Sequence, residues 1–455
     1  KIMSQKYDVV CTNPPYMGSR GMNSNLSNYI NNKFPDSKSD LFAVFIETTN
    51  NALRPRGILS LVTMQSWMFL LSYEQLRKKL LQGNTIIQLM HMNNMVMRIA
   101  FGTAVAILRK KYIKKYIGTY HMVKYEDLSE DYTPKVFPKK DERYNTISQD
   151  NFEKIPGKLI AYWISDKVRI AFEKGVKLKD IGDTRQGMAT SDNNRFLKLW
   201  HEVIENKIGY GCRNANEALQ SGCKWFPYNK GGGYRKWYGN NDYVVNWEND
   251  GAEIKAYASK LYKTATRTIK SISEYFKKSI SWSKVTSGDA AFRYYPEGYI
   301  FDVAGCCIFS NNEKRLCYLL AFLNTSVCKK ILEAISPTLN YETGHIANLP
   351  VFVCNNKQNI INNLVDINVA ISKTEWDSFE TSWDFKKHPL LTHKKEENTI
   401  EEAFNNWSVF SESQFNQLKA NEEDLNRIFI EIYGLQDELT PEVADEDITI
   451  SKADR

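Results

Sequence analysis

Several features that would assign a protein class are missing from this 455-residue chain. No uninterrupted apolar run approaches the roughly 18 residues that a membrane helix needs, and the N-terminus lacks the charged, apolar and small-residue order of a signal peptide. The eight cysteines include no C-x-x-C pair, and the six histidines form no i, i+4 pair. These absences argue against a disulfide framework and against a metal site. They predict free thiols in a reducing cytoplasm and no membrane partner.

Acidic residues are scarce over most of the chain. Residues 1–395 carry 56 basic and 37 acidic groups, whereas residues 396–455 carry 16 Asp and Glu against four Lys and Arg. A basic body with Tyr and Trp among its charges suits a polyanion such as nucleic acid; a solvated basic surface is the alternative. The acidic tail, residues 434–455, has three interpretations: a partner contact, a phosphate mimic that shields the basic region, or a solvated run, which is the ordinary case.

Alternating strand and helix patterns fill residues 1–128. Apolar strands are predicted at 7–13, in the later part of 54–67, at 85–92 and at 103–110, with helices at 39–53 and 72–83, the second capped by Ser72 and stopped by Gly83. This order is typical of the second half of a doubly wound α/β domain. The polar, proline-containing residues 129–158 predict a linker.

The rest of the chain divides by composition into two further regions. Residues 159–355 contain many glycines, aromatics and short strand patterns, which predict a mixed α+β domain, and residues 356–433 are helical in pattern. Within the first of these, three glycines stand between Lys230, Arg235 and Lys236 and several aromatics. Such a loop suits backbone phosphates and exposed bases. The alternative is an irregular loop whose aromatics pack a local core.

The stretch TNPPY carries the clearest chemistry, since Asn13, Pro14, Pro15 and Tyr16 follow the first predicted strand. An exocyclic adenine amine is a poor nucleophile because its lone pair is delocalised into the ring. The side-chain oxygen of Asn13 and the carbonyl of Pro14 can accept its two hydrogens and hold the lone pair toward an electrophilic methyl group. Pro15 removes a competing donor, and Tyr16 offers a flat face to an extruded base. A proline-rich turn without chemistry is the alternative.

This motif resembles the catalytic motif of S-adenosylmethionine-dependent amino methyltransferases, which act on adenine in DNA, on RNA or on protein glutamine. Residues 39–47, 57–70 and 99–110 resemble, in order, the later motifs of the adenine DNA enzymes whose target-recognition domain follows the catalytic domain. Residues 185–196, 280–305 and 320–351 resemble the specificity region of fused restriction-modification enzymes. Together with residues 421–450 they lead us to identify the chain as a member of the PglX family, the adenine methyltransferases of BREX phage-defence systems.

The resemblance implies an architecture, an activity and partners. Residues 1–128 would be the C-terminal half of a class I, Rossmann-like methyltransferase domain, followed by the linker, a target-recognition domain at 159–355, the helical region and the acidic tail. The implied activity is site-specific N6-adenine methylation of double-stranded DNA with S-adenosylmethionine, which marks host DNA as self. Other proteins of the defence system are candidate partners, and we find no nuclease motif in the chain.

The resemblance also implies roles for individual residues. Phe101 would contact the flipped adenine opposite Tyr16, its alternative being a core position at a strand start. Asp40 would close one side of the cofactor pocket, its alternative being a helix N-cap. DNA contacts would come from the loop residues Arg185, Gln186, Thr190, Ser191, Asn193, Asn194 and Arg195, each as a base reader or as a turn or phosphate contact. Lys230, Arg235 and Lys236 would grip the backbone.

One part of the family pattern is missing. In that family the Gly-rich loop and the acidic residue that hold the cofactor precede the catalytic motif, but no strand followed by G-x-G occurs before residue 7. We therefore expect an incomplete enzyme whose cofactor is held mainly by a missing N-terminal methyltransferase segment. The alternative is a non-catalytic DNA-recognition or specificity module. An RNA or protein-glutamine enzyme would not need roughly 200 residues of basic, aromatic recognition domain.

Overall fold

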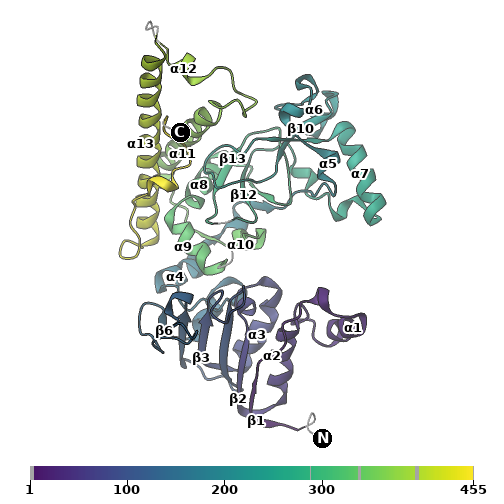
Figure 1. Ribbon diagram of the computed structural model, residues 1–455, viewed down its shortest axis with the longest axis vertical. Helices are drawn as coiled ribbons and strands as arrows, with labels where there is room; N and C mark the ends of the chain where they lie inside the picture. The colour runs from purple at the N-terminus through teal and green to yellow at the C-terminus, as the bar shows by residue number, and fades with distance from the viewer. Residues whose placement is uncertain (1–4, 287, 337–339, 395–398, 454–455) are drawn as a thin grey trace. The chain divides into compact units, whose positions relative to one another are not determined.

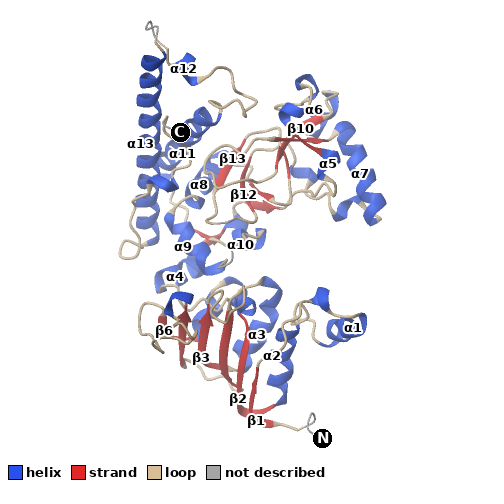
Figure 2. Ribbon diagram, viewed as in Figure 1, coloured by secondary structure: helices blue, strands red, loops and turns tan. Residues whose placement is uncertain are grey.

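The computed structural model describes residues 5–286, 288–336, 340–394 and 399–453 (Figure 1). The chain forms two compact units, residues 1–173 and residues 174–455. None of the described helices is long and apolar enough to cross a membrane. The unit boundary lies 15 residues beyond the end of the predicted linker, and each unit has its own sheets and helices (Figure 2).

A six-stranded sheet forms the centre of the first unit. Its spatial order is β1-β2-β4-β3-β5-β6, with β1 parallel to β2, β3 parallel to β5 and the other neighbours antiparallel. The strands are β1 (Tyr7–Thr12), β2 (Leu53–Met64), β3 (Thr85–Met92), β4 (Thr103–Arg109), β5 (Ile117–Val123) and β6 (Tyr144–Ser148). Leu59 and Leu61 of β2 are buried while Ser60 and Val62 between them are half-buried, so one face of the sheet is the better covered.

Helices α2 (Leu41–Ala52) and α3 (Glu74–Gly83) lie in the connections between strands β1, β2 and β3, and the first unit also contains α1 (Ser24–Lys33) and α4 (Asp166–Lys174) (Figure 1). Helix α2 begins at Asp40, whose carboxylate accepts a hydrogen bond from the Phe42 amide. Helix α3 ends at Gly83 as predicted, but its N-cap is Tyr73 with no side-chain cap bond. The predicted Ser72 cap is therefore wrong: Ser72 lies in a preceding 3-10 turn, Leu71–Tyr73.

The second half of the segment predicted as a linker, residues 144–158, is folded onto the sheet, whereas residues 131–140 are exposed. Strand β6 pairs with β5, and Phe152 and Ile155 are fully buried. The buried Gln149 side chain accepts from the Ile86 amide and donates to the Leu81 carbonyl. The linker prediction failed because these few buried residues stand among many polar ones, which dilutes the periodicity that marks a core strand.

The second unit contains two four-stranded sheets (Figure 2). One has the order β14-β10-β11-β9 and the other β13-β12-β15-β8, while β7 (Val176–Lys177) pairs with β16 (Pro350–Val351). The strands are β8 (Asp183–Arg185), β9 (Leu197–Leu199), β10 (Trp225–Asn229), β11 (Tyr243–Asn246), β12 (Ser279–Ser283), β13 (Phe292–Tyr295), β14 (Ile300–Phe301) and β15 (Gly305–Phe309). Trp247, Tyr275, Phe276 and Phe301 contribute to a shared aromatic core.

Helices surround these sheets and form the C-terminal part of the second unit. They are α5 (Asn193–Phe196), α6 (Ala215–Gln220), α7 (Glu248–Tyr262), α8 (Glu313–Leu323), α9 (Ser326–Ile335), α10 (Thr343–Ala347), α11 (Gln358–Trp376), α12 (Pro389–Thr392) and α13 (Ile400–Tyr433). Helix α13 begins with a capping box in which Thr399 and Glu402 satisfy each other's amides. It ends at Gly434, whose φ of 66° is the left-handed conformation that terminates helices.

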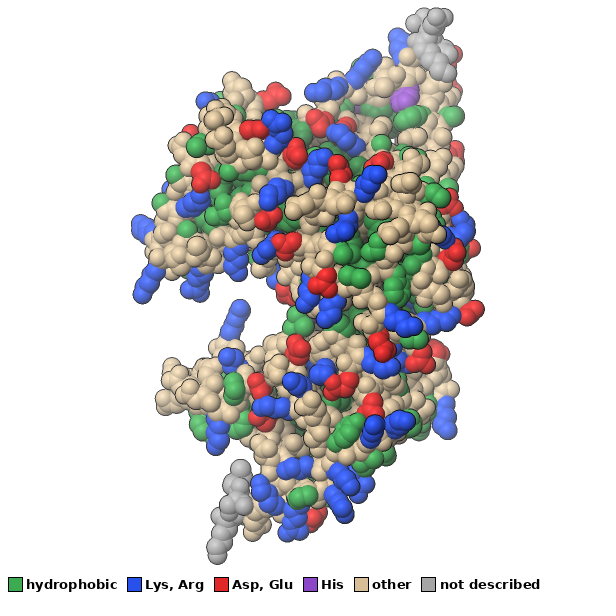
Figure 3. Space-filling view, turned by 180° about the vertical axis from the view of Figure 1, so that it is seen from behind, with side chains coloured by type: hydrophobic (Ala, Val, Ile, Leu, Met, Phe, Trp, Pro, Cys, Tyr) green, Lys and Arg blue, Asp and Glu red, His purple; other side chains and the backbone are tan. Residues whose placement is uncertain are grey.

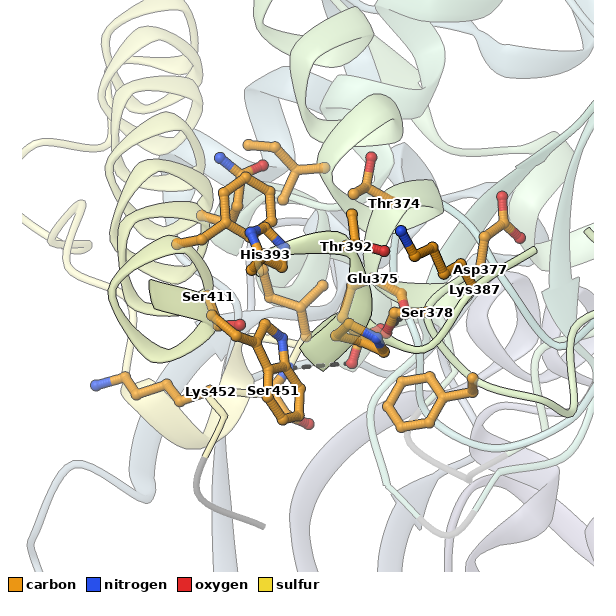
Figure 4. Close-up of a pocket in the computed structure, with 17 residues that line it drawn as sticks. Thr374, Glu375, Asp377, Ser378, Lys387, Thr392, His393, Ser411, Ser451 and Lys452 are labelled. Carbon is orange, nitrogen blue, oxygen red and sulfur yellow. Dashed lines mark hydrogen bonds between the residues drawn. The ribbon is translucent and has the colours of Figure 1, made fainter. Parts of the chain in front are cut away.

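The acidic tail is packed rather than solvated. Leu435, Ile448, Ile450 and Ala453 are buried. Ser451 donates its amide hydrogen to the Glu375 carboxylate, beside a pocket that α11, α13 and the tail line together (Figure 4). The solvated interpretation is wrong because apolar residues spaced through the acidic run hold it against the helices.

Candidate functional site

The Asn-Pro-Pro-Tyr turn lies directly after β1, at the carboxyl end of that strand. Asn13 and Pro15 are exposed, Pro14 is buried and Tyr16 is half-buried. The Tyr16 hydroxyl lies 3.3 Å from the Val62 carbonyl oxygen on β2 and 3.4 Å from Asn13 Oδ1. The first contact places the ring beside the neighbouring strand. Both distances are long for O–H···O bonds, so the Asn13 oxygen remains available to another donor.

Tyr16 and Phe101, predicted to face one base, do lie together. Their ring centroids are 5.9 Å apart at an interplanar angle of 63°, and Phe42 of α2 lies 6.1 Å from Tyr16. Phe101 is 37% exposed, so it does not occupy the buried core position that was its alternative. Burial raises the pKa of Tyr16, which keeps the phenol protonated. The result is an aromatic surface beside an available amide.

Asp40 connects the turn to helix α2. Its Oδ1 accepts from the Met17 amide at 3.0 Å and from the Phe42 amide at 3.2 Å. The Leu41 amide in turn donates to the Met17 carbonyl at 3.0 Å. The N-cap alternative is therefore confirmed, while a cofactor contact stays a prediction. Burial and the nearby Asp40 charge raise the pKa of Tyr73, so the carboxylate has a protonated phenol as neighbour.

Strand β1 forms an edge of the six-stranded sheet, where it pairs with β2 alone among the described residues. Val9 is 63% exposed and Cys11 is exposed as well. The prediction of a buried strand at this place is wrong for this chain. The apolar residues are present, but no described element covers them or pairs with the second edge of the strand.

Hydrogen bonds within the predicted recognition loop, residues 185–196, and from the loop to residues 301–303 hold the loop in place. Gln186 donates through its side chain to the Val303 carbonyl at 3.4 Å, and the Met188 amide donates to the Phe301 carbonyl at 3.0 Å. Thr190 is buried and bonds to Asn193 Oδ1 at 2.5 Å. Ser191 has a left-handed φ of 63°. These residues shape the loop, which leaves the exposed Asn194 with the freest side chain of the predicted polar set.

The two arginines of this loop are paired within the chain. Arg185 lies 2.7 Å from the Asp183 carboxylate. Arg195 lies 2.7 Å from Glu253 of α7, with its guanidinium 5.1 Å from the Tyr257 ring centroid. Both arginines remain about half exposed, so a DNA contact stays a prediction for each, one in which the pair would have to open or be shared.

Lys230, Arg235 and Lys236 have partners of their own. Lys230 pairs with the buried Asp302 at 2.6 Å. Arg235 lies 2.6 Å from Glu375 of α11 and over the Trp376 ring. Lys236 is 6% exposed. The structure thus gives Arg235 and Lys236 a role within the fold, and the prediction of an open basic loop is corrected: Trp237, at its centre, is fully buried, as the local-core alternative expected.

Lys236 belongs to a buried cluster with α13. Its ammonium lies 2.6 Å from Glu422 Oε2, the Trp237 indole donates to Glu422 Oε1 at 2.7 Å, and the Lys236 amide donates to the Thr449 hydroxyl. Sequence analysis missed Glu422 because nothing in the sequence distinguishes it from the other glutamates of the acidic C-terminal region. It also missed the Val62 carbonyl, which carries no side-chain signal.

Gly187 permits the close approach of the recognition loop to β14. A Cβ at this position would lie 1.9 Å from the Phe301 carbonyl oxygen. We expect Gly187→Ala to displace the loop and to lower the free energy of unfolding by about 1–3 kcal/mol. Gly233→Ala is the matched control, because nothing lies within 4 Å of a Cβ there. Thermal unfolding of both variants tests this, and equal melting temperatures would contradict it.

Comparison with known proteins shows what the chain is similar to. Residues 1–96 match the family described as Eco57I restriction-modification methylase. The whole chain is 37% identical to the adenine-specific methyltransferase PglX of Lacticaseibacillus casei (strain Zhang), of which it covers 38%. Over 96% of its length it is 34% identical to the adenine-specific methyltransferase BrxX of Escherichia coli O9:H4 (strain HS), of which it covers 35%. The chain therefore spans less than two fifths of each of these relatives.

One solved structure shares the fold. The Type IIL restriction-modification enzyme MmeI, solved in complex with DNA, aligns with a TM-score of 0.55 at 12% identity and covers 97% of this chain and 56% of that one. At this identity the likeness shows a common mixed α/β fold. The resemblance to the PglX family that the sequence motifs indicated is confirmed: over its whole length this chain is similar to part of the adenine-specific methyltransferases PglX and BrxX.

Proposed function

We propose that this chain is the base-binding and DNA-recognition part of a site-specific N6-adenine DNA methyltransferase that serves a BREX-like phage-defence system. The observation that carries the proposal is the exposed Asn13 amide beside the facing rings of Tyr16 and Phe101. The similarity of the chain to enzymes named as adenine-specific methyltransferases supports the same reaction. In this layout the first unit is part of a class I methyltransferase domain, and the sheets of the second unit carry target recognition.

The proposed chemistry uses the groups of the turn. An adenine flipped out of the duplex stacks against Tyr16 and is contacted by Phe101. Asn13 Oδ1 and the Pro14 carbonyl accept the two amine hydrogens, which turns the nitrogen lone pair toward the incoming methyl group. S-adenosylmethionine, when bound, supplies that electrophilic methyl. Val62 keeps the Tyr16 ring in place through its carbonyl, and Asp40 does the same for the backbone that follows.

Few of the described residues are placed to bind the cofactor. Gly18 precedes and Gly21 ends a three-residue 3-10 turn, Ser19–Gly21, and Gly57 lies inside β2. None of these glycines opens a helix, as a cofactor-binding loop does. One oxygen of Asp40 is already shared between two amides. We therefore propose that a further methyltransferase segment holds most of S-adenosylmethionine, and the free edge of β1 supports the pairing of such a segment.

The second candidate function is a non-catalytic DNA-recognition module, which the scarcity of cofactor contacts favours. Transfer of labelled methyl groups to adenine in duplex DNA separates the two candidates. The chain is assayed alone and mixed with the upstream segment of the methyltransferase, with Asn13→Ala as the blank. Transfer by the mixture supports the methyltransferase proposal. Binding of DNA without transfer in either sample would leave the recognition module.

The β1 edge gives this experiment a structural control. We expect Val9→Lys to reduce methyl transfer by the mixture at least tenfold, because a charge at the edge opposes pairing with another strand. Ile117→Lys is the matched variant: Ile117 is 59% exposed, close to the 63% of Val9, but lies on β5, which is separated from β1 by three strands. Equal activity of the two variants would argue against assembly at this edge.

A further inference from the structure

One stretch of the second unit contains several basic residues and no acidic residue. From Ile254 to Ser273 the sequence contains five Lys and Arg and no Asp or Glu. Lys255 pairs with Asp250. The other four are exposed, and none of them has an ion pair within the described part of the chain. We call these four residues the basic strip: Lys260, Lys263, Arg267 and Lys270.

The basic strip begins in the last turn of α7 and continues beyond its end. Lys260 is in that turn, where a positive charge suits the helix dipole. Lys263 has a left-handed φ of 68° and terminates the helix, so Arg267 and Lys270 lie past it, in short 3-10 turns and their connections. The helix dipole therefore accounts for the charge of Lys260 and not for the charges of the other three residues.

Hydrogen bonds tie the basic strip to the recognition loop. The Ala189 amide donates to the Thr268 carbonyl at 2.9 Å, and the Ser271 hydroxyl donates to the Gln186 carbonyl at 3.0 Å. Thr268 lies next to Arg267, and Ser271 next to Lys270. The loop and the strip thus form one continuous surface. Figure 3 shows Lys and Arg side chains gathered along the edge of this unit where α7 lies.

The charges of the loop and of the strip differ in kind. Arg185 and Arg195 of the loop are neutralised by Asp183 and Glu253, whereas the basic strip carries four uncompensated charges. The guanidinium carbon of Arg267 lies 5.1 Å from the centroid of the Tyr262 ring, a cation–π contact. Exposed hydroxyls accompany these charges: Ser259 directly precedes Lys260, and Thr264 and Thr266 lie between Lys263 and Arg267. Cations and hydroxyls on one surface are the groups that contact phosphate oxygens of a nucleic acid backbone.

We infer that the basic strip holds the phosphodiester backbone of duplex DNA beside the recognition loop and sets the register in which that loop meets the base edges. This inference rests on the proposed function, because it takes DNA as the substrate. It adds a binding surface outside both the loop and the 230–236 segment. The strip supplies affinity without sequence preference, and the loop supplies the preference.

The test compares two triple variants of the full chain that remove equal charge. The strip variant is Lys263→Gln, Arg267→Gln and Lys270→Gln; the control is Lys314→Gln, Arg315→Gln and Lys386→Gln, three exposed residues outside the strip. Binding of labelled duplexes is measured at several salt concentrations. The slope of log K against log salt should fall by about 2–3 for the strip variant and by less than about one for the control. The loss should be equal on duplexes of different sequence.

Each outcome has a distinct meaning. Unchanged binding by the strip variant, or equal slopes for the two variants, would overturn the inference while leaving the methyltransferase proposal intact. Loss of binding to one sequence alone would also overturn it, because the strip would then read bases. If the unmodified chain binds no duplex, DNA recognition by this chain fails together with the inference. Unchanged melting temperatures for both variants confirm that folding is preserved.

Discussion

Replacement of Asn13 by Ala should lower methyl transfer to adenine by at least about 100-fold in the assembled enzyme, while DNA affinity changes less than twofold. The side-chain oxygen is the group that orients the amine, and loss of one such oriented hydrogen bond costs about 10²–10³ in rate. Asn13 is exposed, and among the described residues its side chain contacts the Tyr16 hydroxyl at 3.4 Å. Its removal therefore leaves the fold intact.

The control for this prediction is Asn28→Ala, an exposed Asn on helix α1, which should transfer methyl groups at the normal rate. Single-turnover transfer and duplex binding are measured on the same preparations. Full activity of Asn13→Ala would remove the basis for the proposed reaction. A large loss of DNA affinity in this variant would instead place Asn13 in binding rather than in orientation of the amine.

Glu422→Gln should lower the free energy of unfolding by about 3–5 kcal/mol. Glu422 and Lys236 are 3% and 6% exposed, and removal of one partner of a buried pair leaves the other charge without compensation. Gln keeps the size of the side chain and an acceptor for the Trp237 indole, so the loss reports the unpaired ammonium. Urea unfolding measures it. A double variant, Glu422→Gln with Lys236→Met, should recover most of the loss.

Asp424→Asn is the matched control on the same helix. Asp424 and Arg427 form an ion pair with side chains 53% and 60% exposed, and pairs of this kind contribute at most about 1 kcal/mol. Equal destabilisation by Glu422→Gln and Asp424→Asn would show that the 236–422 pair is not buried as described. A double variant less stable than Glu422→Gln alone would contradict the unpaired-charge explanation.

The same pair gives stability a pH dependence. Burial disfavours the charged form of Lys236, but the Glu422 carboxylate together with Tyr234 and Asp447 outweighs it, so that the pKa of Lys236 is raised above 10.5. A group whose pKa is raised in the folded state contributes stability that is complete below its unfolded pKa and lost as pH rises through the folded value. We expect the free energy of unfolding of the wild type, measured with urea, to fall relative to that of the double variant above about pH 10.5.

Local patterns predicted six elements of the first unit, β1 to β4, α2 and α3, but not α1, α4, β5 or β6. Strands and helices between Tyr7 and Arg109 follow apolar periodicity and helix end signals that lie within a few residues of each other. The meeting of Tyr16 and Phe101 was predicted from motif resemblance, since 85 residues separate them. Residues 129–158 and the tail were misjudged because what holds them is distant: β5 for the first, α11 and α13 for the second.

The sequence did not indicate which basic side chains form ion pairs. Lys230, Arg235 and Lys236 are basic in sequence, but carboxylates up to 186 residues away neutralise them. The four residues of the basic strip are of the same types and have no such partner among the residues that the structure describes. No short stretch of sequence distinguishes the two sets, because ion pairing depends on which residues, distant in the sequence, the fold brings close to each basic side chain.

The buried contact between Lys236 and Glu422 limits how the proposed recognition domain can be exchanged between related enzymes. A hybrid made by transplanting residues 174–355 alone would bring Lys236 and Trp237 into a host without their glutamate, and would start with an unsatisfied ammonium at its core. A graft that extends through α13 to Thr449 carries its own counterion and its own tail contact. The unit that can be swapped is therefore set by electrostatics, not by the length of the sheets.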